Sequence, residues 1–214
     1  MPQVFVWAAI AAITVLFLKP QSPADVPKAP SVGIYMDFET APSEESVQVM
    51  EKEVSQILQA SGVSLDWRSL KDNHGSEPFA GLVVLKFKGA CRAGGLYPIL
   101  NDAGSIDNAA SEELGSTRVD RGHVLPYTEV ECDRVRQALA YLGPAGQKER
   151  QHALGIALAR VVSHELYHVL ASTTAHAEKG IAKASHPLED LIPDGKLALR
   201  NQESLAIQNA FSKK

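Results

Sequence analysis

The sequence predicts a fold of the α+β or α/β class, in which a twisted mixed sheet of four to five strands packs on one long helix. Three observations support this expectation. Short β-rich apolar stretches recur through the first two thirds of the chain. A helical pattern separates the first two of them. Residues 147–171 then form a pattern that is apolar over most of a helix circumference, which is typical of a buried helix.

The expected elements follow the order β-α-β-β-β-β-α. The first helix begins at Ser43, whose hydroxyl is suited to an N-cap, and Glu44 and Glu45 in its first turn suit the positive end of the helix dipole. Apolar residues then recur at three- and four-residue steps until Gly62, which ends the helix. The expected strands span residues 32–38, 63–67, 82–88, 116–120 and 123–132.

The last two strands are expected to form a hairpin around the turn Arg121-Gly122. Pro126 in the second strand has no N–H to donate, which predicts either a sheet edge or a bulge there. A long loop over residues 89–115 precedes the hairpin, and a short helix over residues 133–142 follows it. Residues 188–211 are expected to form one or two short helices, a small C-terminal subdomain that closes the domain.

Residues 1–18 are expected to be a signal peptide or an N-terminal membrane anchor. The fifteen residues 4–18 carry no charge. As a helix rising about 1.5 Å per residue they span roughly 22 Å, less than the ~30 Å hydrocarbon core, which is typical of a secretory signal. Because no Lys or Arg precedes Val4, a membrane tether through residues 4–18 is the alternative. Both alternatives place the rest of the chain outside the cytoplasm, either secreted or anchored.

The four prolines in residues 19–31 predict an extended spacer, and residues 32–214 have the size of a single domain. Cys91 and Cys132 predict either one disulfide, which would agree with export, or two reduced and buried thiols. The formal net charge of −4 gives no electrostatic basis for binding nucleic acid, so we exclude that class of partner.

Residues 164–168 read His-Glu-Leu-Tyr-His, an H-E-x-x-H motif inside the long expected helix. At about 100° per residue, His164 and His168 lie only about 40° apart on one helix face, so two imidazole nitrogens can converge on one metal ion. Glu165 lies roughly 80° from their midpoint, beside such an ion rather than on it. The motif therefore predicts a metal site on one edge of a buried helix.

With this motif in a long helix that follows a sheet ending in a hairpin, residues 32–176 resemble the zincin superfamily of zinc metallopeptidases. The order of strands and helices is similar to that of the metzincin branch in particular. The resemblance implies one Zn²⁺ ion bound by His164 and His168, with Glu165 as the general base. It also implies that the edge strand of the hairpin binds an extended peptide by adding it to the sheet.

The third ligand departs from the metzincin pattern. Ala171 and Thr174 stand where that pattern has a glycine and a histidine, and no methionine follows His168, so there is no Met-turn. A catalytic zinc usually has three protein ligands, and His176 is the predicted third one, because the poor helix formers before it allow the chain to fold back. The competing candidates are Glu178, His186 and Glu189.

The expected function is zinc-dependent hydrolysis of peptide bonds, by an endopeptidase acting on peptide or protein substrates outside the cytoplasm. Glu165 would take a proton from a zinc-bound water, the resulting hydroxide would attack the carbonyl carbon, and Glu165 would then protonate the leaving amine. The alternative is a zincin-like binding module that holds the metal without catalysing a reaction. A fourth protein ligand in place of an open position would favour that alternative.

Overall fold

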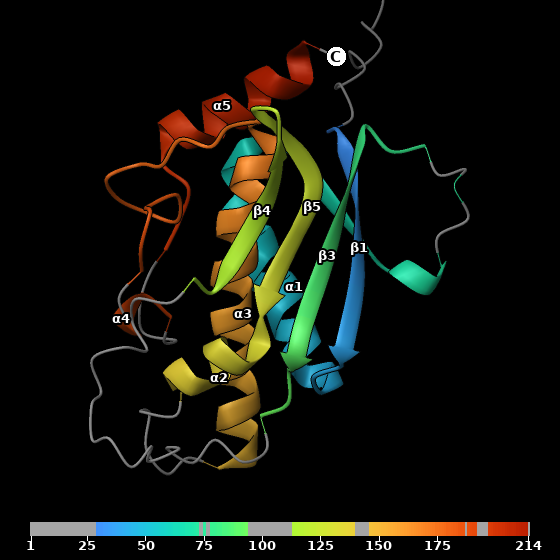
Figure 1. The fold of residues 1–214 in the computed structure, drawn as a ribbon. Helices are drawn as coiled ribbons and strands as arrows, with labels where there is room; N and C mark the ends of the chain where they lie inside the picture. Colours follow the sequence, from blue (N-terminus) through green and yellow to red (C-terminus); the bar gives the residue numbers. More distant parts are fainter. Residues whose placement is uncertain are drawn as a thin grey trace, which may run out of the picture.

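The computed structural model describes residues 29–72, 75, 78–93, 113–139, 146–186, 188–191 and 197–213 (Figure 1). The expected signal peptide or anchor over residues 1–18 lies outside these residues, as does most of the expected spacer over residues 19–31. Among the helices of the described part of the chain, none is both long enough and apolar enough to cross a membrane.

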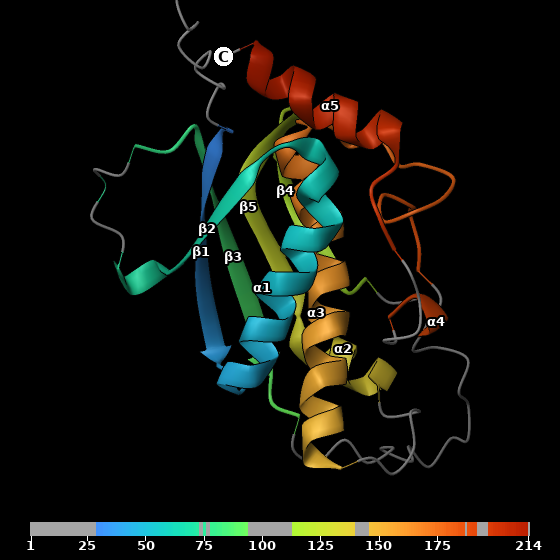
Figure 2. The same cartoon turned by 180° about the vertical axis from the view of Figure 1, so that it is seen from behind.

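One five-stranded sheet is formed by β1 (Ser31–Thr40), β2 (Ser64–Ser69), β3 (Gly81–Ala90), β4 (Gly115–Asp120) and β5 (His123–Glu131). The strands lie in the order β2-β1-β3-β5-β4, and Figure 2 labels all five. β2, β1, β3 and β5 are parallel to one another, and β4 pairs antiparallel with β5. The prediction of a mixed sheet of four to five strands is therefore confirmed.

Two helices, α1 (Glu44–Leu58) and α3 (Gln147–Leu170), pack side by side against one face of this sheet, as Figure 2 shows. The long helix expected over residues 147–171 is therefore present and lies against the sheet. The remaining helical segments are α2 (Cys132–Leu139), α4 (Leu188–Leu191), α5 (Asn201–Ser212) and the 3₁₀ turns η1 (Gln59–Ser61) and η2 (Leu70–Asp72). The short helices predicted near the C-terminus correspond to α4 and α5.

The signals at both ends of α1 act as the sequence predicts. The hydroxyl of Ser43 accepts a hydrogen bond from the backbone N–H of Ser46 at 3.2 Å, which caps the first turn. The last turn tightens into η1, and Gly62 ends it with a φ of +70°, a left-handed conformation that glycine adopts without strain. The cap at Ser43 and the turn at Gly62 together fix the length of the helical segment that packs against α3.

The predicted hairpin is formed by β4 and β5. Arg121 and Gly122 both have positive φ, 47° and 82°, as a tight two-residue hairpin turn requires. The register shifts between Thr117 and Val119, opposite a stretch of β5 that contains Pro126. Of the predicted sheet edge or bulge at this proline, the structure shows a shift in the register of the pairing. β5 itself is an interior strand, and β4 is the edge.

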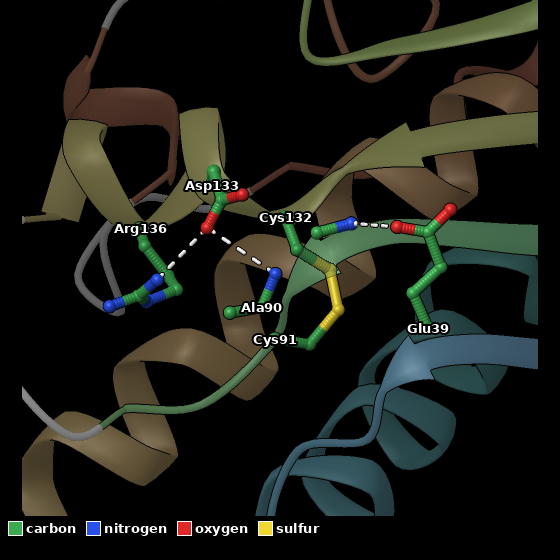
Figure 3. Close-up of a disulfide and its surroundings, with 7 residues drawn as sticks. Glu39, Ala90, Cys91, Cys132, Asp133 and Arg136 are labelled. Atoms are coloured by element: carbon green, nitrogen blue, oxygen red, sulfur yellow. Dashed lines mark hydrogen bonds and ion pairs between the residues drawn. A yellow bond between two sulfur atoms is a disulfide. The ribbon is translucent and has the colours of Figure 1, made fainter.

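Cys91 and Cys132 form a disulfide that joins the end of β3 to the start of α2 (Figure 3). Both residues are fully buried, and because their sulfurs are bonded to each other, the alternative of two reduced and buried thiols is wrong. Beside the disulfide, the backbone N–H of Ala90 donates to the carboxylate of Asp133 at 3.3 Å. Closing a loop of sequence separation 41 lowers the entropy of the unfolded chain by an amount worth about 4 kcal/mol. Residues 94–112 of the predicted loop lie outside the described residues.

The helix α3 is buried around nearly its whole circumference from Ala153 onward. It comes very close to α1 at Gly155, where a Cβ atom would lie 2.7 Å from the carbonyl oxygen of Ser46 and 2.7 Å from Cβ of Val49. A side chain at this position would therefore push the two helices apart. The contact fixes α3 against α1 at this position, and the H-E-x-x-H motif lies on the last two turns of α3.

We expect Gly155→Ala to lower the free energy of unfolding by about 1–2 kcal/mol, because the cost of overpacking exceeds the gain of about 1 kcal/mol in helix propensity. Urea denaturation followed by circular dichroism measures the difference. His152→Ala, at an exposed position of the same helix, is the matched control and should change stability by less than about 0.5 kcal/mol. A Gly155→Ala protein as stable as the wild type would contradict the close packing of α1 and α3.

Candidate metal centre

Two histidines project from one face of α3, one helical turn apart. The Nε2 atoms of His164 and His168 lie 3.1 Å from each other, and the two rings meet edge to face with centroids 4.8 Å apart. The helix produces this arrangement because residues four apart lie one above the other on the same face. His168 is buried, and His164 is partly buried.

Backbone carbonyls hold both rings in a fixed orientation. Nδ1 of His164 lies 2.8 Å from the carbonyl oxygen of Ile181, and Nδ1 of His168 lies 2.8 Å from that of Thr173. A carbonyl oxygen can only accept a hydrogen bond, so these partners assign an N–H to each Nδ1. In the neutral form, each ring therefore presents an unprotonated Nε2 with a free lone pair.

The two Nε2 lone pairs, 3.1 Å apart, repel each other unless a proton or a cation lies between them. A proton is disfavoured, because burial lowers the pKa of His164 to about 4 and also lowers the pKa of His168. Two nitrogens that each bind a tetrahedral ion at 2.0–2.1 Å lie about 3.3 Å apart, close to the distance seen here. The pair therefore fits a divalent metal ion.

The chain reverses directly after α3. Ser172 has a φ of +49°, in the left-handed region. Its backbone N–H donates to the carbonyl of Val169 at 3.2 Å, and the N–H of Thr173 donates to that of His168 at 3.0 Å, which together form a Schellman cap. Ala171, where the metzincin pattern has glycine, keeps a right-handed conformation. The reversal thus occurs at a residue with a side chain, which accepts some backbone strain.

His176 follows this reversal and completes a group of three imidazoles. The ligand atoms of His164, His168 and His176 all lie within 4.8 Å of one another. The ring of His176 has its centroid 5.3 Å from that of His164 and 4.7 Å from that of His168. Because His176 is exposed, the group is open to solvent on this side. The structure thus brings together the three histidines named from the sequence as metal ligands.

The competing third ligands do not join this group. Glu178 is exposed and lies outside it, among the residues that the structure describes. His186 has oxygen partners at both ring nitrogens, with Nε2 3.0 Å from the carbonyl oxygen of Ile181 and Nδ1 3.2 Å from a carboxylate oxygen of Asp190. The side chain of Glu189 lies outside the described residues.

Glu165 is only 4% exposed and is held against the edge strand β4. The hydroxyl of Thr117 donates to its Oε2 at 2.6 Å, a length typical of a hydrogen bond to an ionised carboxylate. Gly115 leaves the room that this carboxylate needs, since a Cβ atom there would lie 2.9 Å from Oε1. The edge strand therefore sets the position of the carboxylate together with α3.

Burial raises the pKa of Glu165 to about 7. The hydrogen bond from Thr117 lowers this pKa, and the negative charge of Glu113 raises it further, so that burial is the largest of three contributions. A carboxyl group with a pKa near neutrality can both take up and release a proton at pH 7. This is the property that a general base needs.

Sequence reasoning missed the groups that orient these side chains. The carbonyls of Ile181 and Thr173 carry no signal in the sequence, because every residue has one. Thr117 was placed correctly in a strand of the hairpin, whereas Gly115 was expected in the preceding loop and is the first residue of β4. Only the packing of that strand on α3 reveals the contact of both residues with Glu165.

No protein-family model matches this chain, and no curated protein is found to be similar to it. The class of protein therefore has to be inferred from the fold and the site. These define a mixed α/β domain with three histidines that could hold a metal ion beside a buried carboxylate.

We expect His176→Ala to weaken Zn²⁺ binding by more than about 100-fold, because even the residues that orient a metal ligand are worth about 10–100-fold. Competition with a chromophoric chelator measures the dissociation constant, and elemental analysis of the wild type should give one zinc per chain. His152→Ala removes an exposed histidine of α3 and should bind zinc as the wild type does. Unchanged zinc affinity in His176→Ala would remove this residue from the ligand set.

We expect Thr117→Val to raise the pKa of Glu165 in the metal-free protein above its wild-type value of about 7. The substitution removes the hydrogen bond that stabilises the ionised carboxylate, so the protonated form gains. The carboxyl ¹³C chemical shift of Glu165, followed as a function of pH, measures this pKa. Thr117→Ser keeps the hydroxyl and should titrate close to the wild type, and an equal pKa in all three proteins would contradict the contact.

Proposed function

We propose that this protein is a zinc-dependent endopeptidase that acts outside the cytoplasm. The observation that carries the proposal is the pair of unprotonated Nε2 atoms of His164 and His168, 3.1 Å apart, with the ligand atom of His176 beside them. Three neutral imidazoles are a donor set that zinc favours, and three protein ligands leave a fourth position for a reactant. Zn²⁺ is therefore the proposed ion.

When bound, zinc supplies Lewis acidity, which lowers the pKa of water and polarises a carbonyl group. Glu165 would be the general base, and its carboxylate would take the proton from the attacking water and pass it to the leaving amine. Two properties support this role. Burial raises its pKa to about 7, and the hydrogen bond from Thr117 holds Oε2 in a fixed direction.

A peptide substrate would bind along β4. In the described residues this strand pairs only with β5, so its other edge has backbone N–H and C=O groups available for a further strand. A peptide added there would lie about 4.8 Å beyond β4, and β4 contacts Glu165 through Thr117. An extended peptide is therefore the substrate class that we propose.

The proposed location outside the cytoplasm is supported by the disulfide between Cys91 and Cys132, since such bonds persist in oxidising compartments. The resemblance to the zincins is part of the proposal as well. Its support is the motif on a long helix that packs on a mixed sheet with an antiparallel edge strand. The ligand spacing remains a variant, since His176 comes eight residues after His168.

We expect Glu165→Gln to lower the rate of peptide hydrolysis by about 10²–10⁴-fold, the range that a general base contributes, while zinc still binds. Cleavage of fluorescently labelled casein by the zinc-loaded protein measures the rate, and elemental analysis measures the metal. Glu178→Gln is the matched control, an exposed glutamate near His176 that lies outside the metal group, and it should leave both unchanged.

The outcomes separate the candidate functions. Full activity in Glu165→Gln would show that this carboxylate is not the base. A wild type that binds one zinc per chain and cleaves neither casein nor a library of peptides would favour the binding module without catalysis. A wild type that takes up no zinc would refute both functions.

A further inference from the structure

The carbonyl oxygen of Ile181 lies within hydrogen-bond distance of two histidines. Nδ1 of His164 lies 2.8 Å from it, and Nε2 of His186 lies 3.0 Å from it. Ile181 is fully buried, so these two N–H groups are well placed to satisfy its oxygen without help from solvent. The group that orients the ligand His164 is therefore itself held by a second histidine. The rings of His164 and His186 meet nearly at right angles, with centroids 5.6 Å apart.

Asp190 holds the other side of His186. Its Oδ2 lies 3.2 Å from Nδ1 of His186 and 3.0 Å from Nζ of Lys183. Burial raises the pKa of Asp190, but the hydrogen bonds from Lys183 and His186 outweigh this and lower the pKa overall, so the carboxylate is ionised and only accepts. Both ring nitrogens of His186 therefore face oxygen acceptors, and each donates an N–H when both bonds form.

The backbone of Asp190 is in turn anchored to α3. Nη1 of Arg160 donates to its carbonyl oxygen at 2.7 Å, and Arg160 is 2% exposed. Nη2 of the same guanidinium lies 3.8 Å from the carboxylate of Glu53 on α1. Arg160 precedes His164 by four residues, so both side chains leave the same face of α3. The contacts thus form a closed circuit. It runs from Arg160 to the backbone carbonyl of Asp190, from the Asp190 carboxylate through His186 to the carbonyl of Ile181, and from there to His164 on the same face of α3.

We propose that His186 and Asp190 are positioning residues for the metal ligand His164, acting through the carbonyl of Ile181. This inference rests on the metal site of the proposed function but not on peptidase activity. The circuit from Arg160 fixes where the carbonyl lies, and the carbonyl fixes the tautomer and the direction of the His164 ring. Groups that orient a ligand in this way contribute to metal affinity because the ring need not be ordered when the metal binds.

His186→Phe tests this inference, because it keeps an aromatic ring and removes both hydrogen bonds. We expect the dissociation constant for Zn²⁺ to rise by about 10–100-fold, measured on the full chain by competition with a chromophoric chelator. Asp190→Asn, which keeps the size of the side chain and removes its charge, should weaken binding in the same direction. His186→Gln retains a donor near the place of Nε2 and should recover most of the affinity.

Lys183→Gln is the matched control, since Lys183 also donates to Asp190 but lies outside the path to His164, and its zinc affinity should stay within about 3-fold of the wild type. Absorption spectra of the Co²⁺-loaded proteins report ligand geometry, and His186→Phe should shift the visible bands while far-ultraviolet circular dichroism shows a native fold. A folded His186→Phe protein with wild-type zinc affinity and cobalt spectrum overturns this inference alone. A wild type that binds no zinc overturns the proposed function and this inference together.

Discussion

The site depends on two hydrogen bonds from histidine Nδ1 atoms to backbone carbonyls. These bonds, at Ile181 and Thr173, place the proton of each ring on the side away from the other ring. The unprotonated Nε2 atoms of His164 and His168 then lie next to each other, on successive turns of α3. Without those carbonyls, either ring could turn or change tautomer, and the pair could become an ordinary hydrogen bond between two imidazoles. The two backbone carbonyls therefore determine whether His164 and His168 can bind a metal ion together or instead form a hydrogen bond with each other.

The fold makes these carbonyls available because it fixes α3 on several sides. α1 and the sheet bury most of its circumference, and the segment after its C-terminus returns to the same helix face. Thr173 lies in the reversal at Ser172, and Ile181 lies in the segment that Arg160 anchors. The edge strand β4 approaches from another side and contacts Glu165. The acidic group and the imidazoles are thus held by different parts of the chain, which lets each be positioned separately.

Those parts of the fold that local patterns encode could be predicted from the sequence. The period of α3, the N-cap at Ser43 and the Arg121-Gly122 turn are each determined by a few neighbouring residues, and the structure confirms all three. The Cys91–Cys132 pair stayed open because sequence separation does not give spatial distance. The third ligand stayed open for a related reason. The position of His176 depends on the turn at Ser172, which adopts a left-handed conformation although it is not a glycine. The sequence therefore gives little indication of this turn.

The disulfide also changes what a break in the backbone would do to the protein. It closes a covalent ring that contains β4, β5 and the whole stretch between β3 and α2. If a protease cut that stretch once before β4, the two resulting polypeptides would remain joined through sulfur. The strand beside Glu165 would then have one free end, and its other end would lead through β5 to Cys132, where the disulfide joins it to the end of β3. A single cut there would therefore leave β1, β2 and β3 covalently joined to the part of the chain that carries the three histidines.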